Sequence, residues 1–97
     1  MHVISQKALR DFWDRYPDAE QPLKAWYRLT KSAHWQSPAD VKAQFRSTGF
    51  VGNNRVVFNI AGNQYRLIVA VRYRIRRVFI RFVGTHRQYD AVDAKEV

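Results

Sequence analysis

Four side chains near the end of the sequence combine the groups that move protons in enzymes. His86, Arg87, Tyr89 and Asp90 follow one another within a single short stretch. An unperturbed histidine titrates at about pH 6.5, so His86 can give or take a proton near neutrality. Tyr89 is three residues further on and shares a face with His86 if a helical turn forms there. We predict acid–base chemistry at this cluster, with His86 as first candidate and Tyr89 as second.

The same residues also have structural interpretations. His86 could cap or pack against a helix after Thr85, and Tyr89 could cover a sheet edge or stack on a base. The other two histidines, His2 and His34, lie far from the cluster, and the chain has no cysteine to supply a thiolate ligand. We therefore expect neither a metal site nor a cofactor.

A long basic stretch precedes the cluster. The chain has a net charge of +9, and no Asp or Glu lies between Val41 and Tyr89. Like charges repel one another in a folded protein, so a polyanionic partner explains them, and arginine grips phosphate in two places. The alternative is a basic surface that serves solubility or binds a membrane. The ten cations are Lys42, Arg46, Arg55, Arg66, Arg72, Arg74, Arg76, Arg77, Arg81 and Arg87.

Length and composition restrict the class of protein. The 97 residues suit a single domain over 1–97, and 46% hydrophobic residues can form its core. No apolar run reaches the roughly 18 residues that a membrane span needs. The first residues show no apolar signal core, so we expect a cytoplasmic protein that does not enter membranes.

The spacing of apolar residues predicts three helices in the first half of the chain. A short strand at 2–4 comes first. Ser5 can cap a helix that Pro17 ends, and Asp18 with Gln21 resembles the capping box of a second helix. Ser37 followed by a proline predicts a short third helix to about residue 46.

After Gly49 the apolar period changes from helical to alternating, which predicts antiparallel strands over 55–60, 64–74 and 77–85. Turns at residues 62–63 and 75–76 then keep apolar partners on one face. We expect an α+β fold with the N-terminal helices on one face of a small antiparallel sheet. The predicted pairs are Ile60 with Tyr65, Phe58 with Leu67, Val56 with Val69, Tyr73 with Val78, Val71 with Ile80 and Val69 with Phe82.

The face of this sheet away from the helices, called the open face below, is predicted to mix arginines with apolar side chains. Such a face indicates either a small second cluster beneath the C-terminal tail or third helix, or a groove. In a groove, arginines hold phosphates while apolar side chains touch bases or a protein partner. We favour the groove, and the two interpretations are compatible. The predicted members are Arg55, Val57, Asn59, Arg66, Ile68, Ala70, Arg72, Arg74, Phe79, Arg81 and Val83.

Four stretches of the sequence resemble the HigB toxin family. They are DAEQPLKAWY at 18–27, GNNRVVFNI at 52–60, GNQYRL at 62–67 and GTHRQYD at 84–90. They occur in order, at matching spacing, over nearly the whole chain. The resemblance implies a RelE-like fold and a toxin that cleaves messenger RNA on the ribosome without a metal. It also implies a HigA-type helix-turn-helix antitoxin, through which the pair binds operator DNA.

The resemblance also implies roles for individual residues. RNA cleavage needs a base for the 2′-hydroxyl, an acid for the leaving 5′-oxygen and cations for the phosphate. RelE-like enzymes place strand arginines on the phosphate, which indicates Arg66 and Arg81 beside His86 and Tyr89. One histidine does not fit a two-histidine mechanism, so the order of acid and base stays open. The expected RNA contacts are Lys42, Arg46, Arg55, Arg72, Arg74, Arg76, Arg77 and Arg87.

Other functions fit the same residues. A non-catalytic nucleic-acid-binding module would use the arginines and leave His86 and Tyr89 structural. A gyrase-targeting toxin like ParE would keep the fold and lack the nuclease chemistry. The arginines at 72–77 could equally dock the antitoxin.

Overall fold

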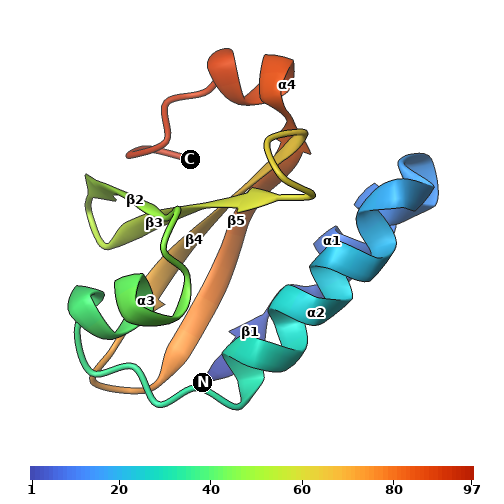
Figure 1. Ribbon diagram of the computed structural model, residues 1–97. Helices are drawn as coiled ribbons and strands as arrows, with labels where there is room; N and C mark the ends of the chain where they lie inside the picture. Colours follow the sequence, from blue (N-terminus) through green and yellow to red (C-terminus); the bar gives the residue numbers. More distant parts are fainter.

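A five-stranded sheet organises the chain, and the computed structural model describes all of residues 1–97 (Figure 1). The strand order is β1-β5-β4-β3-β2. The strand β1 runs parallel to β5, and all other neighbours are antiparallel. The α+β prediction is confirmed, as is the short first strand. The strands are β1 (His2–Ile4), β2 (Gly49–Gly52), β3 (Arg55–Ile60), β4 (Tyr65–Arg72) and β5 (Arg77–Thr85).

Helices α1 and α2 lie side by side against the sheet, as predicted (Figure 1). None of the helices is long and apolar enough to cross a membrane. Ser5 and Ser37 are the N-cap residues of α1 and α3, as predicted, but neither side chain makes a capping hydrogen bond, and Ser5 has a left-handed φ of 79°. The predicted cap at Asp18 is wrong, because the N-cap residue of α2 is Ala19. The helices are α1 (Gln6–Arg15), the 3₁₀ turn η1 (Pro17–Ala19), α2 (Glu20–Lys31), α3 (Pro38–Gln44) and α4 (His86–Asp90).

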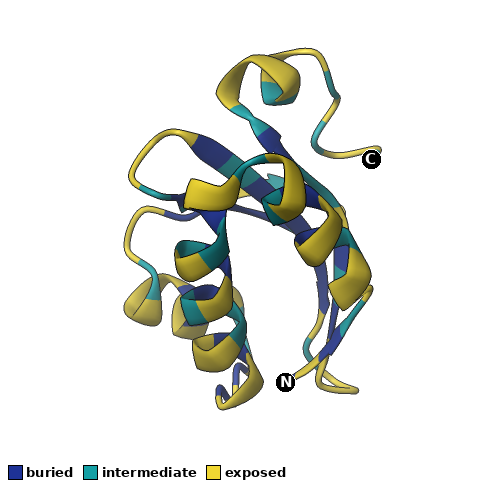
Figure 2. Ribbon diagram, turned by 90° about the vertical axis from the view of Figure 1, so that its right-hand side faces the viewer, coloured by how far each residue is buried: buried dark blue, intermediate teal, exposed yellow.

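An aromatic cluster around Phe58 of β3 joins the helices to the sheet. The ring of Phe58 lies 5.4 Å from Trp26 of α2, 5.1 Å from Phe45 and 6.3 Å from Trp35. Trp35 precedes α3 and Phe45 follows it, so these contacts hold both α2 and α3 on the same face of the sheet. The strands beneath are buried, and the outer sides of the helices are exposed (Figure 2). Large aromatic rings dominate the energetics of such a core.

The register of the first hairpin agrees with the prediction and that of the second does not. All three predicted β3–β4 pairs are present. In the second hairpin, β4 ends at Arg72, and Val78 pairs with Val71 where the prediction paired it with Tyr73. A two-residue turn at 75–76 would need a positive φ at β-branched Ile75. The observed four-residue turn 73–76 needs one only at Arg76, whose φ is 58°.

A β-bulge at Arg81 places the last residues of β5 on the faces opposite to those predicted. Ile80 pairs with Val69 and Phe82 pairs with Ile68, so Arg81 has no partner on β4. The extra residue inverts the alternation of side chains beyond it. Phe82 therefore lies on the open face, and Val83, which was predicted there, packs against the core.

The strand β2 was not among the predicted strands. It pairs with β3 at the edge of the sheet, through Gly49 with Val57 and Phe50 with Val56. Its four residues begin and end in glycine, a residue depleted in strands. A sequence this short and glycine-rich carries no period-2 signal, which is why the apolar pattern gave no strand here.

A hydrogen bond from the Tyr65 hydroxyl to the carboxylate of Asp18 ties the start of β4 to η1. The Tyr65 ring also contacts Phe12 and Tyr16 of the α1 end, at 5.2 Å and 5.7 Å between ring centroids. The hydrogen bond to Asp18, together with burial, raises the pKa of Tyr65 to about 12. Asp18 thus acts in tertiary structure, whereas the sequence pattern predicted a helix cap.

We predict that Tyr65→Phe lowers the free energy of unfolding by about 1 kcal/mol near neutral pH, because it removes this hydrogen bond. The tyrosine keeps its proton up to about pH 12 in the folded state and loses it near pH 10 when unfolded. Its contribution is therefore complete below pH 10 and declines as the pH rises from 10 to 12. Urea unfolding, followed through buried Trp26 and Trp35, should show a wild-type advantage that shrinks over this range. An advantage that does not depend on pH would contradict this assignment.

Candidate functional site

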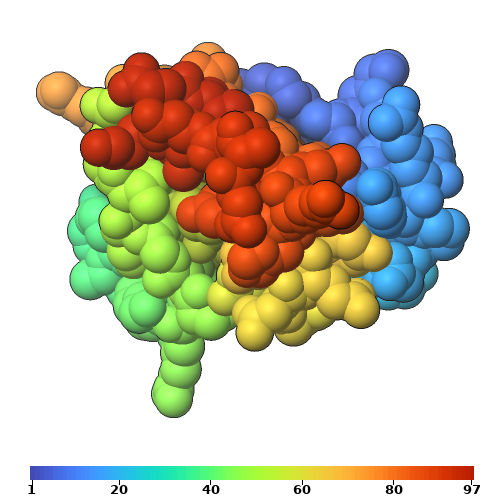
Figure 3. Space-filling model, turned by 90° about the horizontal axis from the view of Figure 1, so that it is seen from above, coloured from blue at the N-terminus to red at the C-terminus, as the bar shows by residue number.

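Part of the open face is buried although no helix of the N-terminal half covers it. The exposed fractions of Val57, Ile68 and Ala70 are only 6%, 0% and 4%. The residues after α4 fold back over this face toward the β2–β3 turn (Figures 1 and 3). There the Arg55 Nε donates to the Val97 carbonyl at 3.1 Å, and the Asn53 amide donates to the Lys95 carbonyl at 3.2 Å. This is the small second cluster that one interpretation of the sequence predicted.

The arginines around this cluster have no acidic partner. The three ion pairs of the chain are Lys7–Asp11, Lys24–Glu20 and His86–Asp90, and none involves an arginine. Arg72 and Arg81 are exposed, and Arg55 and Arg66 are half-buried. The open face therefore presents guanidinium groups that no Asp or Glu side chain pairs with, and such a charge distribution favours a polyanionic partner.

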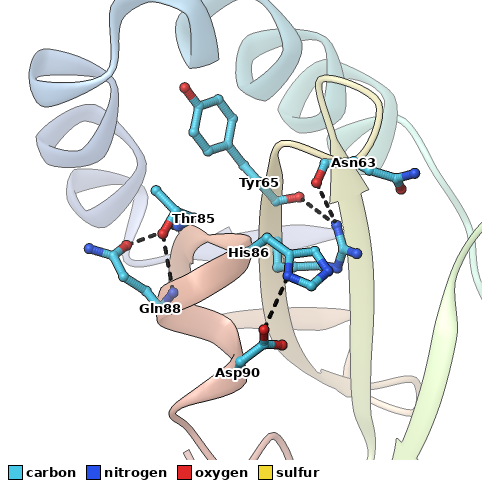
Figure 4. A network of polar contacts seen from close by, with 7 residues as sticks. Asn63, Tyr65, Thr85, His86, Gln88 and Asp90 are labelled. Carbon is cyan, nitrogen blue, oxygen red and sulfur yellow. Dashed lines mark hydrogen bonds and ion pairs between the residues drawn. The ribbon is translucent and has the colours of Figure 1, made fainter.

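The helix α4 begins at the end of β5 and carries His86 on its first turn. The Thr85 hydroxyl accepts a hydrogen bond from the Gln88 N–H at 3.1 Å, and the Thr85 N–H donates to the Gln88 side-chain oxygen at 2.9 Å (Figure 4). This is a capping box. The His86 N–H donates to the Gln64 carbonyl at 3.2 Å, which fixes the start of α4 against the β3–β4 turn. The T-x-x-Q pattern at 85–88 is the sequence signal for this helix, which the predicted elements did not include.

Four side chains form what is called the α4 cluster below: Arg66, His86, Tyr89 and Asp90. The Nδ1 of His86 lies 3.3 Å from the Asp90 carboxylate (Figure 4). The Arg66 guanidinium lies over the Tyr89 ring, 5.7 Å from its centroid, and donates to the Asn63 carbonyl at 3.2 Å. The helical turn that would place His86 and Tyr89 on one face is therefore present, and β4 brings Arg66 to it.

Gly84 lies where β5, β4 and the first turn of α4 come together. It pairs with Arg66 across the sheet. A Cβ atom at this position would lie 2.5 Å from the Phe82 ring and 2.8 Å from the Gln88 side-chain oxygen. A larger residue here would have to displace the Phe82 ring and the side chain of the capping glutamine.

The remaining predicted residues divide into two groups. Arg81 lies in the β5 bulge, four residues before Thr85, and shares a pocket of the open face with Arg55 and Arg72. Arg87 is exposed on α4 itself. Arg87 therefore lies on the same helix as the α4 cluster, and Arg55, Arg72 and Arg81 extend the open face away from it.

The other group lies at the opposite end of β4. The turn 73–76 contains Arg74 and Arg76. Burial, and the Asp40 charge of α3 nearby, raise the pKa of Tyr73 in this turn. The helix α3 is thus beside the turn, and the Lys42 amine donates to the Thr48 carbonyl at 3.0 Å. Lys42 is thus held against the segment that follows α3, whereas Ser47, next to Arg46, accepts a hydrogen bond from Asn59, the β3 partner of Arg66.

An α+β domain with an arginine-lined open face and a cluster of titratable side chains at its rim has the form of a protein that binds or processes nucleic acid. The family model of HigB toxins, described as the RelE-like toxic component of a toxin–antitoxin system, matches residues 19–92. The chain belongs to the HigB toxin family.

Curated relatives agree with the family model over most of the chain. The mRNA interferase toxin HigB of Escherichia coli (strain K12) is 34% identical over 92 residues, which cover 93% of this chain and 88% of that protein. The mRNA interferase HigB of Shigella flexneri has the same identity and coverage. A third, from Escherichia coli O6:H1, is 26% identical over 93% of this chain and 89% of its own length.

We predict that Thr85→Ala lowers the free energy of unfolding by about 1 kcal/mol, because it removes the hydroxyl that accepts from Gln88. Thr85→Ser is the matched control, since it keeps the hydroxyl. Amide hydrogen exchange should show lost protection at Gln88 in Thr85→Ala and retained protection in Thr85→Ser. Equal protection at Gln88 in both variants would show that the side chain does not cap α4.

Proposed function

We propose that this chain is the toxin of a toxin–antitoxin pair and cleaves messenger RNA as a metal-independent endoribonuclease. The observation that carries the proposal is the α4 cluster at the rim of an arginine-lined face without acidic partners. Membership of the HigB toxin family supports it, as do the names of the curated relatives, which are mRNA interferases.

The chemistry is an in-line attack within the RNA strand. The ribose 2′-oxygen bonds to the neighbouring phosphorus as a base removes its proton, and the bond from phosphorus to the 5′-oxygen breaks as an acid supplies a proton. The products are a 2′,3′-cyclic phosphate and a 5′-hydroxyl, so no water or metal is consumed. Two proton-transfer groups and a set of fixed cations suffice for this reaction.

His86 is one of the two proton-transfer groups. The Asp90 carboxylate beside Nδ1 favours the tautomer with the proton on that nitrogen. The other nitrogen, Nε2, is then the atom that exchanges a proton with the substrate. Asp90 acts as a positioning residue, comparable in role to the aspartate that orients a catalytic histidine in a hydrolase triad.

Tyr89 is the second proton-transfer group, and Arg66 and Arg81 bind the phosphate. Arg66 lies over the Tyr89 ring and therefore places its positive charge beside this phenol. Arg81 has no acidic partner and lies on the neighbouring strand. A planar guanidinium stabilises the extra negative charge of the transition state through two parallel hydrogen bonds.

The identity of the antitoxin and the role of the ribosome are also part of this proposal. A toxic component of a toxin–antitoxin system has an antitoxin, and we propose one of the HigA helix-turn-helix type that carries the pair to operator DNA. We place cleavage on ribosome-bound messenger RNA in the cytoplasm. The arginines around the 73–76 turn, far from the α4 cluster, are suited to contacts with ribosomal RNA because phosphate contacts position a protein without reading sequence.

We predict that His86→Ala with Tyr89→Phe abolishes cleavage, because each proton-transfer group contributes about 10²–10⁴-fold to the rate. The wild type and the double variant are expressed in bacterial cells, and the ends of cellular messenger RNA are mapped. The wild type should arrest growth and produce new internal ends with 5′-hydroxyls, and the double variant should do neither.

His34→Ala is the matched control, since it removes an exposed histidine outside the α4 cluster and should leave cleavage unchanged. Growth arrest by the wild type without new RNA ends would overturn the proposal in favour of a gyrase-type or binding-only toxin. Cleavage by the double variant at the wild-type rate would overturn the assignment of His86 and Tyr89.

A further inference from the structure

A depression in the open face lies where three strands meet. Arg55, Ala70 and Phe79 are direct neighbours across β3, β4 and β5. The Ala70 methyl group is the smallest of the three side chains and lies between the two large ones. The result is a pocket of about 200 Å³, also lined by Arg72 and Arg81. This pocket is called the notch below.

The notch is apolar at its floor and cationic at its rim. Ala70 is 4% exposed, and Phe79 is half-buried. Three arginines surround them, and none forms an ion pair. Arg55 is held in place by the carbonyls of Asn53 and Val97, at 3.0 Å and 3.1 Å. An aromatic face inside a ring of unpaired guanidiniums is the combination that binds single-stranded nucleic acid, through base stacking and phosphate contacts.

The size of the notch limits what it can hold. Pockets for drug-sized molecules measure roughly 300–1,000 Å³, so a volume of about 200 Å³ suits one planar group. Ala70 and Arg66 are four residues apart on the same face of β4, a separation of about 13 Å along a strand. A group in the notch is therefore distinct from the phosphate that Arg66 would hold beside Tyr89.

We propose that the notch is a base-binding subsite for a nucleotide that neighbours the cleaved one. The base stacks on Phe79 over Ala70, and Arg55, Arg72 and Arg81 bind the phosphates on either side of it. Arg81 lines the notch and leads along β5 toward α4, so it connects the subsite to the reacting phosphate. This inference rests on the proposed function and extends it from cleavage of RNA to selection of the RNA sequence.

The test uses the full chain with His86→Ala and Tyr89→Phe, which keeps the RNA intact during binding. The probes are short single-stranded RNAs of one sequence, each lacking the base at a different position. Removal of the base that occupies the notch should weaken binding about tenfold, as expected for one stacked base. When Phe79→Leu is added to this double variant, every probe should bind about tenfold more weakly than the intact RNA binds to the double variant itself. The affinity should then no longer depend on whether the base at that position is present.

Two further variants complete the design. Ala70→Val fills the notch without shortening Phe79, and it should produce the same loss of position dependence. Phe50→Leu is the matched control: Phe50 pairs with the core-facing Val56 of β3, on the other side of the sheet, and the change should alter affinity by less than twofold. Circular dichroism verifies that each variant is folded, and Phe79→Leu alone decides the question if Ala70→Val does not fold.

The outcomes separate this inference from the proposed function. If the active wild type cleaves RNA but no position depends on Phe79, the subsite is overturned and the nuclease remains. If one position depends on Phe79 but the wild type cleaves nothing, the subsite remains and the nuclease is overturned. Absence of any binding to the probes at low salt also overturns the subsite.

Discussion

Repulsion among the cations of the open face is the constraint on which the rest of the structure depends. No Asp or Glu side chain forms an ion pair with an arginine, so the other face of the same sheet must supply the stability. Phe58 and the rings of Trp26, Trp35 and Phe45 do so. The acids are confined to the helices and the C-terminal residues. A bound polyanion relieves the remaining repulsion, so binding and folding act in the same direction.

The bulge at Arg81 connects the core to the α4 cluster. Without it, the alternation of β5 would continue and Phe82 would point toward the helices. With it, Val83 completes the core, Phe82 lies over Gly84, and Gly84 in turn admits the Gln88 side chain that caps α4. One extra residue in a strand therefore orients the helix that carries His86.

The sequence predicted correctly those parts of the fold that short-range signals determine, such as turn glycines and the alternation of apolar residues. Gly62 takes a φ of 69° in the β3–β4 turn, and the predicted register of that hairpin is correct. The second turn contains no glycine, so its length could not be derived from turn residues alone, and the bulge has no signature in the apolar pattern. Asp18 fits a capping box by spacing, but the competing hydrogen bond from Tyr65 comes from 47 residues away. The meeting of Arg66 with Tyr89 depends on the same long-range register.

The α4 cluster is open to solvent, and this openness bears on how it would work. The side chains of His86 and Asp90 are 53% and 63% exposed, so water weakens every charge interaction between them. Catalytic hydrogen bonds commonly tighten only when substrate binds. A strand of RNA held along the open face would exclude water from one side of the cluster, and the proposed ribosome would exclude it from the other. In the proposed mechanism the arginines would therefore do more than attract RNA: by fixing its backbone against β4 and β5, they would create the water-poor environment in which His86 and Tyr89 transfer protons.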